Sequence, residues 1–425
     1  MRKRCQLEIT VSLILAASTW FYVQRILIPY QVADAAAHDR PRGNLSDLYP
    51  RWLGARELLL HHRDPYSEEV TREIQAGYYG RRLDASRQND PKDQQAFAYP
   101  LYVVFLLAPF VSAPFEALRI GFGWLLAVLT AGGVWLWLKA LRWQSRCLVF
   151  VCTVLTLGSF PAVQGIKLQQ LSLLISSLIA ASLALLVSGQ LFLAGVLLAV
   201  ATVKPQLVFL LFAWLALWAL SGWRSRQNFL WGFLSTITVL IVGAELLLPG
   251  WITEFRIAVS NYSHYTGGRS LLDVLLPAPL GRVFTALTFA MLIPVYRRFG
   301  RASAETRNFR LILALVLAVT VVVIPTFAPY NQLLLLPGIF LTVQYTTALW
   351  RRGALARLLV SMGTFLILWQ WFAAISLTAA SVVMSPHAVQ QGWQLPLLTT
   401  VPIPLAVLSI LTILAFEFAN RTTKP

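Results

Sequence analysis

The chain has 425 residues, of which 57% are hydrophobic and only 12% are charged. Soluble domains carry about 25% charged residues, so this composition excludes an ordinary soluble enzyme and a disordered protein. It favours an all-α polytopic membrane protein. The formal net charge is +17, and such a surplus can indicate nucleic acid, an anionic surface or the cytoplasmic side of a membrane protein.

The first apolar run, near 7–29, follows a basic N-terminus and lacks a small-residue cleavage site, so we expect a retained signal anchor. The polar segment 30–98 comes next and holds most of the acidic residues. The run 99–112 is apolar but short, so it crosses the membrane, re-enters it or lies at the interface. Further spans are predicted near 115–138, 147–163, 171–187, 191–203, 207–221, 229–249, 276–296, 310–326, 331–349, 358–381 and 398–418.

The basic residues decide the predicted orientation. If the N-terminus is cytoplasmic and 99–112 does not cross, every short basic cluster falls on the cytoplasmic side, as the positive-inside rule requires. These clusters hold Lys139, Arg142, Arg146, Arg224, Arg226, Arg297, Arg298, Arg301, Arg307, Arg351, Arg352, Arg357, Arg421 and Lys424. The sequence thus predicts one domain over 1–425, with about twelve spans, both termini cytoplasmic and 30–98 external. Nucleic acid is not needed to explain the charge.

The external segment 30–98 contains a predicted amphipathic helix over 53–60 that lies on the membrane surface. Ser46 or Asp47 is placed to cap its start, and Asp64 before Pro65 ends it. Asp47 has a second interpretation, because a carboxylate just outside the first span can act as a general base toward a hydroxyl. Both interpretations of Asp47 remain open at this point.

Metal binding is not predicted. His61 and His62 are adjacent, so on a helix they point about 100° apart and do not readily share one ion. Acidic residues in the most polar stretch are interpreted as solvated loop acids rather than calcium ligands: Asp84, Asp90 and Asp93. The cysteines Cys5, Cys147 and Cys152 form no CxxC pair or cluster with histidine, so neither a zinc site nor a disulfide framework is expected.

Polar side chains at the predicted outer ends of spans are costly in a membrane and often functional. Lys204 lies between two apolar runs, where it either binds a phosphate or snorkels to the interface. His264 and Arg269, in the predicted external loop 250–275, either hold a phosphate or belong to an ordinary loop. The other polar residues at these outer ends are Gln164, Lys167, Gln169, Gln170, Gln206, Asn261, Tyr262, Tyr330, Asn331 and Gln332.

An ordered set of short motifs follows the first span. It comprises Asp47-Leu-Tyr49, Ala55-Arg56-Glu57-Leu58-Leu59, Asp64-Pro65-Tyr66, Tyr99-Pro100-Leu101, Ala194-Gly195-Val196-Leu197-Leu198-Ala199 and Lys204-Pro205-Gln206. Over roughly 7–350, this set resembles glycosyltransferase family 87 of the GT-C membrane glycosyltransferases. Members of that family include the mycobacterial polyprenol-phosphate-mannose-dependent mannosyltransferases. The sequence departs from the family in having Gln169-Gln170 where Gly-Gln is typical, and in the spacing of Tyr49 and Trp52 after the aspartate.

The resemblance implies transfer of mannose, or another hexose or pentose, from a polyprenyl-phosphate carrier to an acceptor hydroxyl on a lipid or glycan. The reaction would invert the sugar at the outer face of a bacterial cytoplasmic (inner) membrane. Asp47 matches the family's base, and Lys204 matches the end of the site that holds the carrier phosphate. The implied substrate-binding residues are Lys204, Gln206, Tyr66, Tyr99, Gln170, His264 and Arg269. No cofactor or metal is expected.

Two other classes of function remain as alternatives. A transporter or flippase for lipid-linked glycans is expected to carry ionisable residues at mid-membrane and inverted repeats. Neither is evident, and Glu245 is the main candidate buried acid. An O-antigen ligase or polymerase also uses lipid-linked sugars, but that class tends to have its large external loop late in the chain, whereas here it follows the first span.

Overall fold

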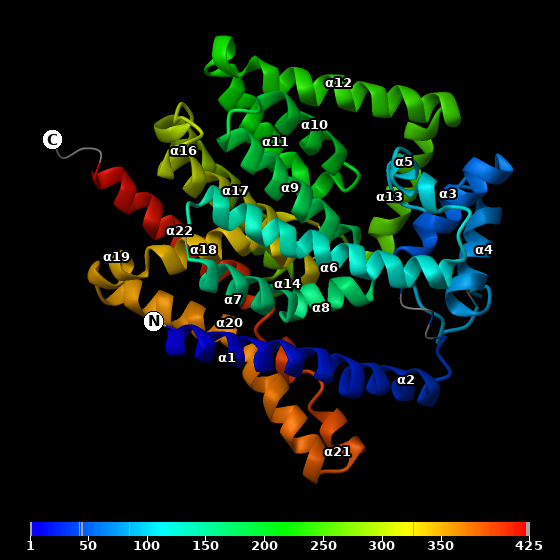
Figure 1. The fold of residues 1–425 in the computed structure, drawn as a ribbon. Helices are drawn as coiled ribbons and strands as arrows, with labels where there is room; N and C mark the ends of the chain where they lie inside the picture. Colours follow the sequence, from blue (N-terminus) through cyan, green and yellow to red (C-terminus); the bar gives the residue numbers. More distant parts are fainter. Residues whose placement is uncertain are drawn as a thin grey trace.

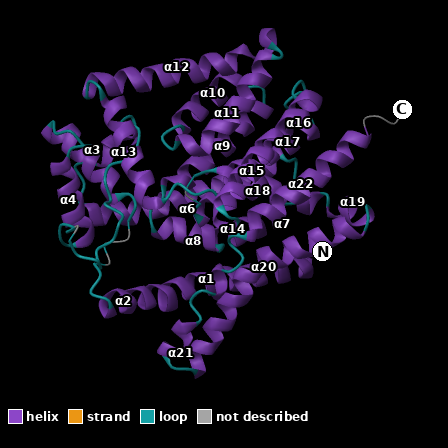
Figure 2. Cartoon of the chain, turned by 180° about the vertical axis from the view of Figure 1, so that it is seen from behind, coloured by secondary structure: helices purple, strands orange, loops and turns teal. Residues whose placement is uncertain are grey.

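The computed structural model describes residues 2–41, 43, 46–84, 86–143, 145–325 and 327–421. Within these ranges every regular element is a helix and no strand occurs (Figure 2). The predicted all-α fold class is therefore confirmed.

The helices of the first half of the chain are α1 (Arg2–Tyr22), the π-helical turn η1 (Val23–Leu27), α2 (Ile28–Ala37), α3 (Tyr49–His61), α4 (Glu68–Tyr79), α5 (Val103–Leu107), the 3₁₀ turn η2 (Ala108–Phe110), α6 (Phe115–Ala140), α7 (Arg146–Leu157), α8 (Phe160–Lys167), α9 (Leu171–Val187), α10 (Leu191–Ala201) and α11 (Pro205–Leu220). The second half contains α12 (Trp223–Leu247), α13 (Trp251–Thr266), α14 (Leu271–Leu275), α15 (Ala278–Ala290), α16 (Leu292–Phe299), α17 (Arg307–Val323), the 3₁₀ segment η3 (Pro329–Leu335), α18 (Leu336–Gln344), α19 (Thr346–Arg351), α20 (Ala354–Val383), α21 (Pro386–Gln391), the 3₁₀ turn η4 (Leu395–Leu397) and α22 (Pro402–Arg421).

Long apolar helices dominate the molecule. Among the described residues, six segments are long and apolar enough to cross a membrane: Lys3–Ala37, Phe115–Ala140, Trp223–Leu247, Pro279–Phe299, Ala354–Val383 and Pro386–Glu417. Their outer faces carry exposed hydrophobic side chains, such as Trp124 on α6, which is 72% exposed. Because soluble proteins rarely expose apolar patches of this extent, these helices indicate a membrane-embedded protein.

Several predicted spans are shorter or broken. The predicted span 147–163 is divided into α7 and α8, which are bent by 56°. Pro161 at the start of α8 explains the break, because proline cannot continue a helix. The predicted span 331–349 is likewise divided among η3, α18 and α19. Three further apolar helices, α9, α10 and α11, are shorter than the six long ones. The count of twelve spans stays a prediction.

The region 99–112 forms only α5 and the turn η2. Five helical residues rise about 7.5 Å, far less than the roughly 30 Å of a bilayer core. This region therefore does not cross as a helix. The predicted external loop 250–275 is also different from expectation, since most of it forms α13 and α14.

The external segment contains two helices. The predicted helix 53–60 is part of the longer α3, which ends where His62 takes a left-handed conformation with φ 54°. The N-cap position of α3 is Leu48, and no side chain caps it, so neither Ser46 nor Asp47 has the predicted capping role. The following helix, α4, is capped by the side chain of Ser67, which accepts from Val70 N.

A disulfide between Cys5 and Cys147 corrects the expectation that the cysteines are unpaired. The two residues are 142 positions apart, and packing of α1 against α7 brings them together. Sequence spacing cannot reveal such a pair. Both cysteines lie near helix ends predicted to be cytoplasmic, where thiols are usually reduced. Cysteine labelling from the two sides of the membrane tests that placement.

The two ends of the molecule differ in what they carry. Both views place the start of α1, the end of α22 and α19 at one end, and α3, α4 and α13 at the opposite end (Figures 1 and 2). The long helices α1, α6 and α12 run between these ends. The helices α3 and α4 of the external segment thus share one end of the helical bundle with α13 of the predicted external loop 250–275.

Candidate active site

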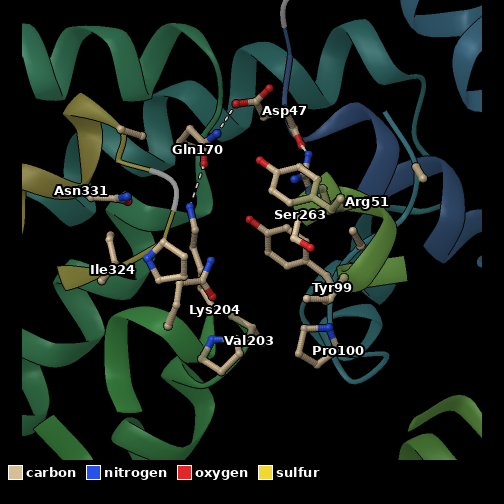
Figure 3. A pocket seen from close by; sticks show the side chains of 18 of the residues that line it. Asp47, Arg51, Tyr99, Pro100, Gln170, Val203, Lys204, Ser263, Ile324 and Asn331 are labelled. Atoms are coloured by element: carbon tan, nitrogen blue, oxygen red, sulfur yellow. Dashed lines mark hydrogen bonds between the residues drawn. The ribbon is translucent and has the colours of Figure 1, made fainter. Parts of the chain in front are cut away.

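One cavity of about 470 Å³ gathers polar side chains from widely separated parts of the chain. They come from the start of α3, the stretch before α5, the turns preceding α9 and α11, α13 and η3. In Figure 3, Gln170 and Lys204 lie on one wall, and Tyr99 and Arg51 lie on the other. Asp47 lies at one end of the cavity, next to Gln170.

Asp47 occupies a turn that is fixed by the main chain. Its backbone N–H donates to Leu168 O at 2.8 Å, which ties the start of α3 to the α8–α9 turn. Its carboxylate accepts a hydrogen bond from Gln170 Nε2 (Figure 3). Because the side chain is not used as a helix cap, its oxygens are available to the cavity.

The two adjacent glutamines of the α8–α9 turn have different partners. Gln169 takes a left-handed conformation with φ 49°, and its amide bonds back to Ile166 O and Lys167 O, each at 2.8 Å. Gln170 instead points into the cavity, where its Nε2 donates to Asp47 and its Oε1 accepts from Lys204 Nζ at 3.4 Å. A carboxylate at one end and an ammonium at the other fix the orientation of this amide.

Lys204 is a buried cation of the site, because the residue is only 7% exposed. Pro205 occupies the first position of α11, so Lys204 is held outside helical geometry in the α10–α11 turn. Its ammonium donates to Ser172 Oγ at 2.6 Å and lies 5.1 Å from the centroid of the Tyr330 ring. Ser172 Oγ in turn donates to Asn331 Oδ1 at 2.9 Å.

No ion pair of Lys204 with a carboxylate occurs within the described ranges; its contacts there are neutral oxygens and an aromatic face. Burial of a charge without a directly bound counter-charge is costly. An anionic ligand in the cavity would supply that counter-charge.

Arg51 is a site residue that sequence reasoning did not select. Its guanidinium donates to the main-chain oxygen of Asp47 and lies 4.4 Å from the centroid of the Tyr99 ring. Its Nε is buried and has no hydrogen-bond partner in the part of the chain that the structure describes. The available signal was its position on α3 four residues after Asp47, which is about one helical turn.

Asp93 also lines the cavity, which corrects its interpretation as a solvated loop acid. Its carboxylate accepts from the backbone N and the side-chain Nε2 of Gln95, both at 2.9 Å. Asp84 and Asp90 are absent from the cavity lining; both bond within their own loop.

The structure brings together five of the eight predicted site residues, namely Asp47, Tyr99, Gln170, Lys204 and Gln206. Tyr66 lies behind the wall, where its hydroxyl donates to Tyr99 O at 2.6 Å. His264 is exposed on α13, with Nδ1 2.8 Å from Ser260 O. Arg269 lines a different cavity. Only the first five are therefore placed to contact one ligand.

Burial shifts the pKa values of both Asp47 and Lys204. It raises the pKa of the Asp47 carboxyl, and Arg51, the bond from Gln170 and Lys204 offset only part of that effect. Burial also lowers the pKa of the Lys204 ammonium, with a partial offset from Tyr99 and Asp47. Asp47 is thus a stronger base than an exposed aspartate, and Lys204 gains from a bound anion.

A comparison with protein-family models, curated proteins and solved structures finds no significant match to this chain.

Within the described residues no group of three or more His, Cys, Asp or Glu is arranged to hold a metal ion. The cavity thus offers a carboxylate base at one end and two cations, Lys204 and Arg51, on its walls. This arrangement can deprotonate a hydroxyl and bind a phosphate in one enclosed space.

Proposed function

We propose that the chain is a membrane glycosyltransferase of the GT-C type that resembles family 87. It would transfer a sugar from a polyprenyl-phosphate carrier to an acceptor hydroxyl on a lipid or glycan. The observation that carries the proposal is the linked arrangement of Asp47, Gln170 and Lys204 in one cavity. A base and a phosphate-binding cation are the two groups that this reaction needs.

In the proposed reaction, the Asp47 carboxylate takes the proton of the acceptor hydroxyl. The acceptor oxygen then forms a bond to the anomeric carbon on the face opposite the phosphate, while the bond from that carbon to the phosphate oxygen breaks. The sugar is inverted, and the polyprenyl phosphate leaves with the bonding electrons. Lys204 and Arg51 stabilise the negative charge that develops on the phosphate. Tyr99 and Gln206, which also line the cavity, would contact the sugar.

The assay that tests this function incubates the purified protein with polyprenyl-phosphate mannose and a membrane lipid extract, and measures released polyprenyl phosphate as a function of pH. We expect turnover that is lost as the pH falls, because the base must be deprotonated. Since burial raises the pKa of Asp47, the loss should be centred above the ordinary aspartate value of 3.8. Transport of the intact donor without cleavage would contradict the proposal and favour a flippase.

We further propose that the chain crosses a bacterial inner membrane about twelve times, with both termini cytoplasmic and the Asp47 cavity external. The start of α1 and the end of α22 lie at the opposite end of the bundle from α3 and α4, which supports this orientation (Figure 1). It also accounts for the basic residues at the termini and near α19, as the positive-inside rule requires.

Cysteine labelling tests the orientation. In a chain with the native cysteines replaced by serine, a cysteine at the exposed position Ser86 should react with a membrane-impermeant maleimide in intact cells. A cysteine at Ser225, also exposed but at the start of α12, should react only after the cells are permeabilised. Labelling of Ser225→Cys in intact cells would refute the orientation, and would make the Cys5–Cys147 disulfide easier to understand.

A further inference from the structure

A second cavity of about 660 Å³ is lined by the turn between α13 and α14, by α14 and by the start of α15, and its charged lining residues are Arg269, Asp273 and Arg282. A smaller cavity of about 290 Å³ adjoins it and shares Asp273 and Arg282. This smaller cavity also shares Gly268 and Pro325 with the Asp47 cavity. Gly268 lines all three cavities, so the cavities meet beside the Asp47 site.

The two arginines of the second cavity are exposed, and no hydrogen bond or ion pair of either guanidinium occurs within the described residues. One oxygen of the neighbouring Asp273 carboxylate, Oδ2, accepts from Ser270 Oγ at 2.8 Å and from Ser270 N at 3.1 Å. Two unpaired guanidinium groups favour an anion with several oxygen acceptors. With Asp273 counted, the lining carries one net positive charge, which matches the single negative charge of a phosphodiester.

The helix that carries Arg282 identifies the kind of molecule that bears this phosphate. The segment Pro279–Phe299 is the least buried of the six long apolar segments. Only 6% of its apolar 18-residue stretch is buried inside the protein. Its exposed hydrophobic side chains begin directly beside Arg282: Leu280, Val283, Phe284 and Leu287. An anion with hydrocarbon chains fits both features, because its phosphate meets the arginines while its chains cover this apolar face.

We propose that Arg269 and Arg282 bind the phosphate of an anionic phospholipid whose acyl chains lie along α15. The site is separate from the phosphate position at Lys204, because neither arginine lines the Asp47 cavity. It requires only that the chain is embedded in a bilayer. Its test involves no turnover, so failure of the lipid site and failure of the proposed glycosyltransferase activity are distinguishable.

The experiment uses the full chain extracted from nanodiscs of equimolar phosphatidylglycerol and phosphatidylcholine, followed by native mass spectrometry of the retained lipid. We expect wild-type protein to retain phosphatidylglycerol selectively. The double substitution Arg269→Gln/Arg282→Gln should lower that retention by about tenfold, because it removes the charge-assisted hydrogen bonds to the phosphate. The matched control is Arg256→Gln, an exposed arginine of α13 outside all three cavities, and it should retain the lipid as wild type does.

A second double substitution, Arg269→Lys/Arg282→Lys, keeps the charge and should keep most of the selectivity, which provides a test if the glutamine variant does not fold. Equal retention of phosphatidylglycerol by wild type and a folded Arg269→Gln/Arg282→Gln protein would overturn the proposal. Equal retention of phosphatidylcholine and phosphatidylglycerol by wild type would also overturn it. Complete displacement of the lipid by millimolar inorganic phosphate would show that the acyl chains contribute nothing, and would refute the placement on α15.

Discussion

Replacement of Asp47 by asparagine is expected to lower the rate of sugar transfer by about 10²–10⁴-fold, the usual contribution of a general base. Asparagine has the same shape but cannot accept the proton of the acceptor hydroxyl. The thermal unfolding temperature should change little, because the structure buries this carboxylate at a cost that raises its pKa. The measurement is the initial rate of polyprenyl phosphate release at saturating donor.

Asp84→Asn is the matched control for this substitution. Asp84 belongs to the same external segment, but its carboxylate is exposed and bonds to Ser86, away from the cavity. Its replacement should leave the rate unchanged. If purified Asp47→Asn protein turned over at the wild-type rate, Asp47 would not be the base, and the cavity would need another explanation.

Replacement of Lys204 by alanine is expected to raise the KM for the polyprenyl-phosphate donor by roughly 10- to 100-fold, because a charged hydrogen-bond donor to the phosphate is lost. The effect on kcat should be smaller. Since the ammonium also bonds to Ser172, Lys204→Met is a useful second variant that fills the space without the charge. Donor binding measured without acceptor separates affinity from chemistry.

Lys167→Ala is the control, because Lys167 is a lysine next to the α8–α9 turn but outside the cavity. Lys167 is at the end of α8, donates to Gln24 Oε1 at 2.7 Å and does not line the cavity. Its replacement should not change the KM for the donor. If Lys204→Ala and Lys204→Met both had the wild-type donor KM, Lys204 would not contact the phosphate and would be only a buried structural lysine.

Lys204 shows why part of the site is readable in the sequence. A lysine followed by proline between two apolar runs is expected in a turn between two helices, because proline prevents a continuous helix. Since burial of a charge is costly, such a lysine is also expected to have polar partners or a ligand. Asp47 and Gln170 were selected as site residues chiefly through the resemblance to glycosyltransferase family 87, and the structure places both in one cavity with Lys204.

Arg269 and Arg51 show where that reasoning fails. The sequence places Arg269 on the same predicted side of the membrane as Lys204, but sharing a side does not mean sharing a cavity. The structure puts Arg269 beside Arg282 instead. Arg51 was overlooked because an arginine on an external helix is usually solvated, and only the approach of Tyr99 and the cavity wall buries it.

By itself, the sequence determined that this protein is all-helical, rich in apolar segments and polar mainly in one segment after the first helix. These properties depend on composition and local periodicity, which each stretch of chain carries alone. The tertiary structure decided which helices remain unbroken, that Cys5 meets Cys147, and that Asp47 faces Gln170 and Lys204. Such contacts join residues more than 100 positions apart, so they arise only when the helices pack against one another.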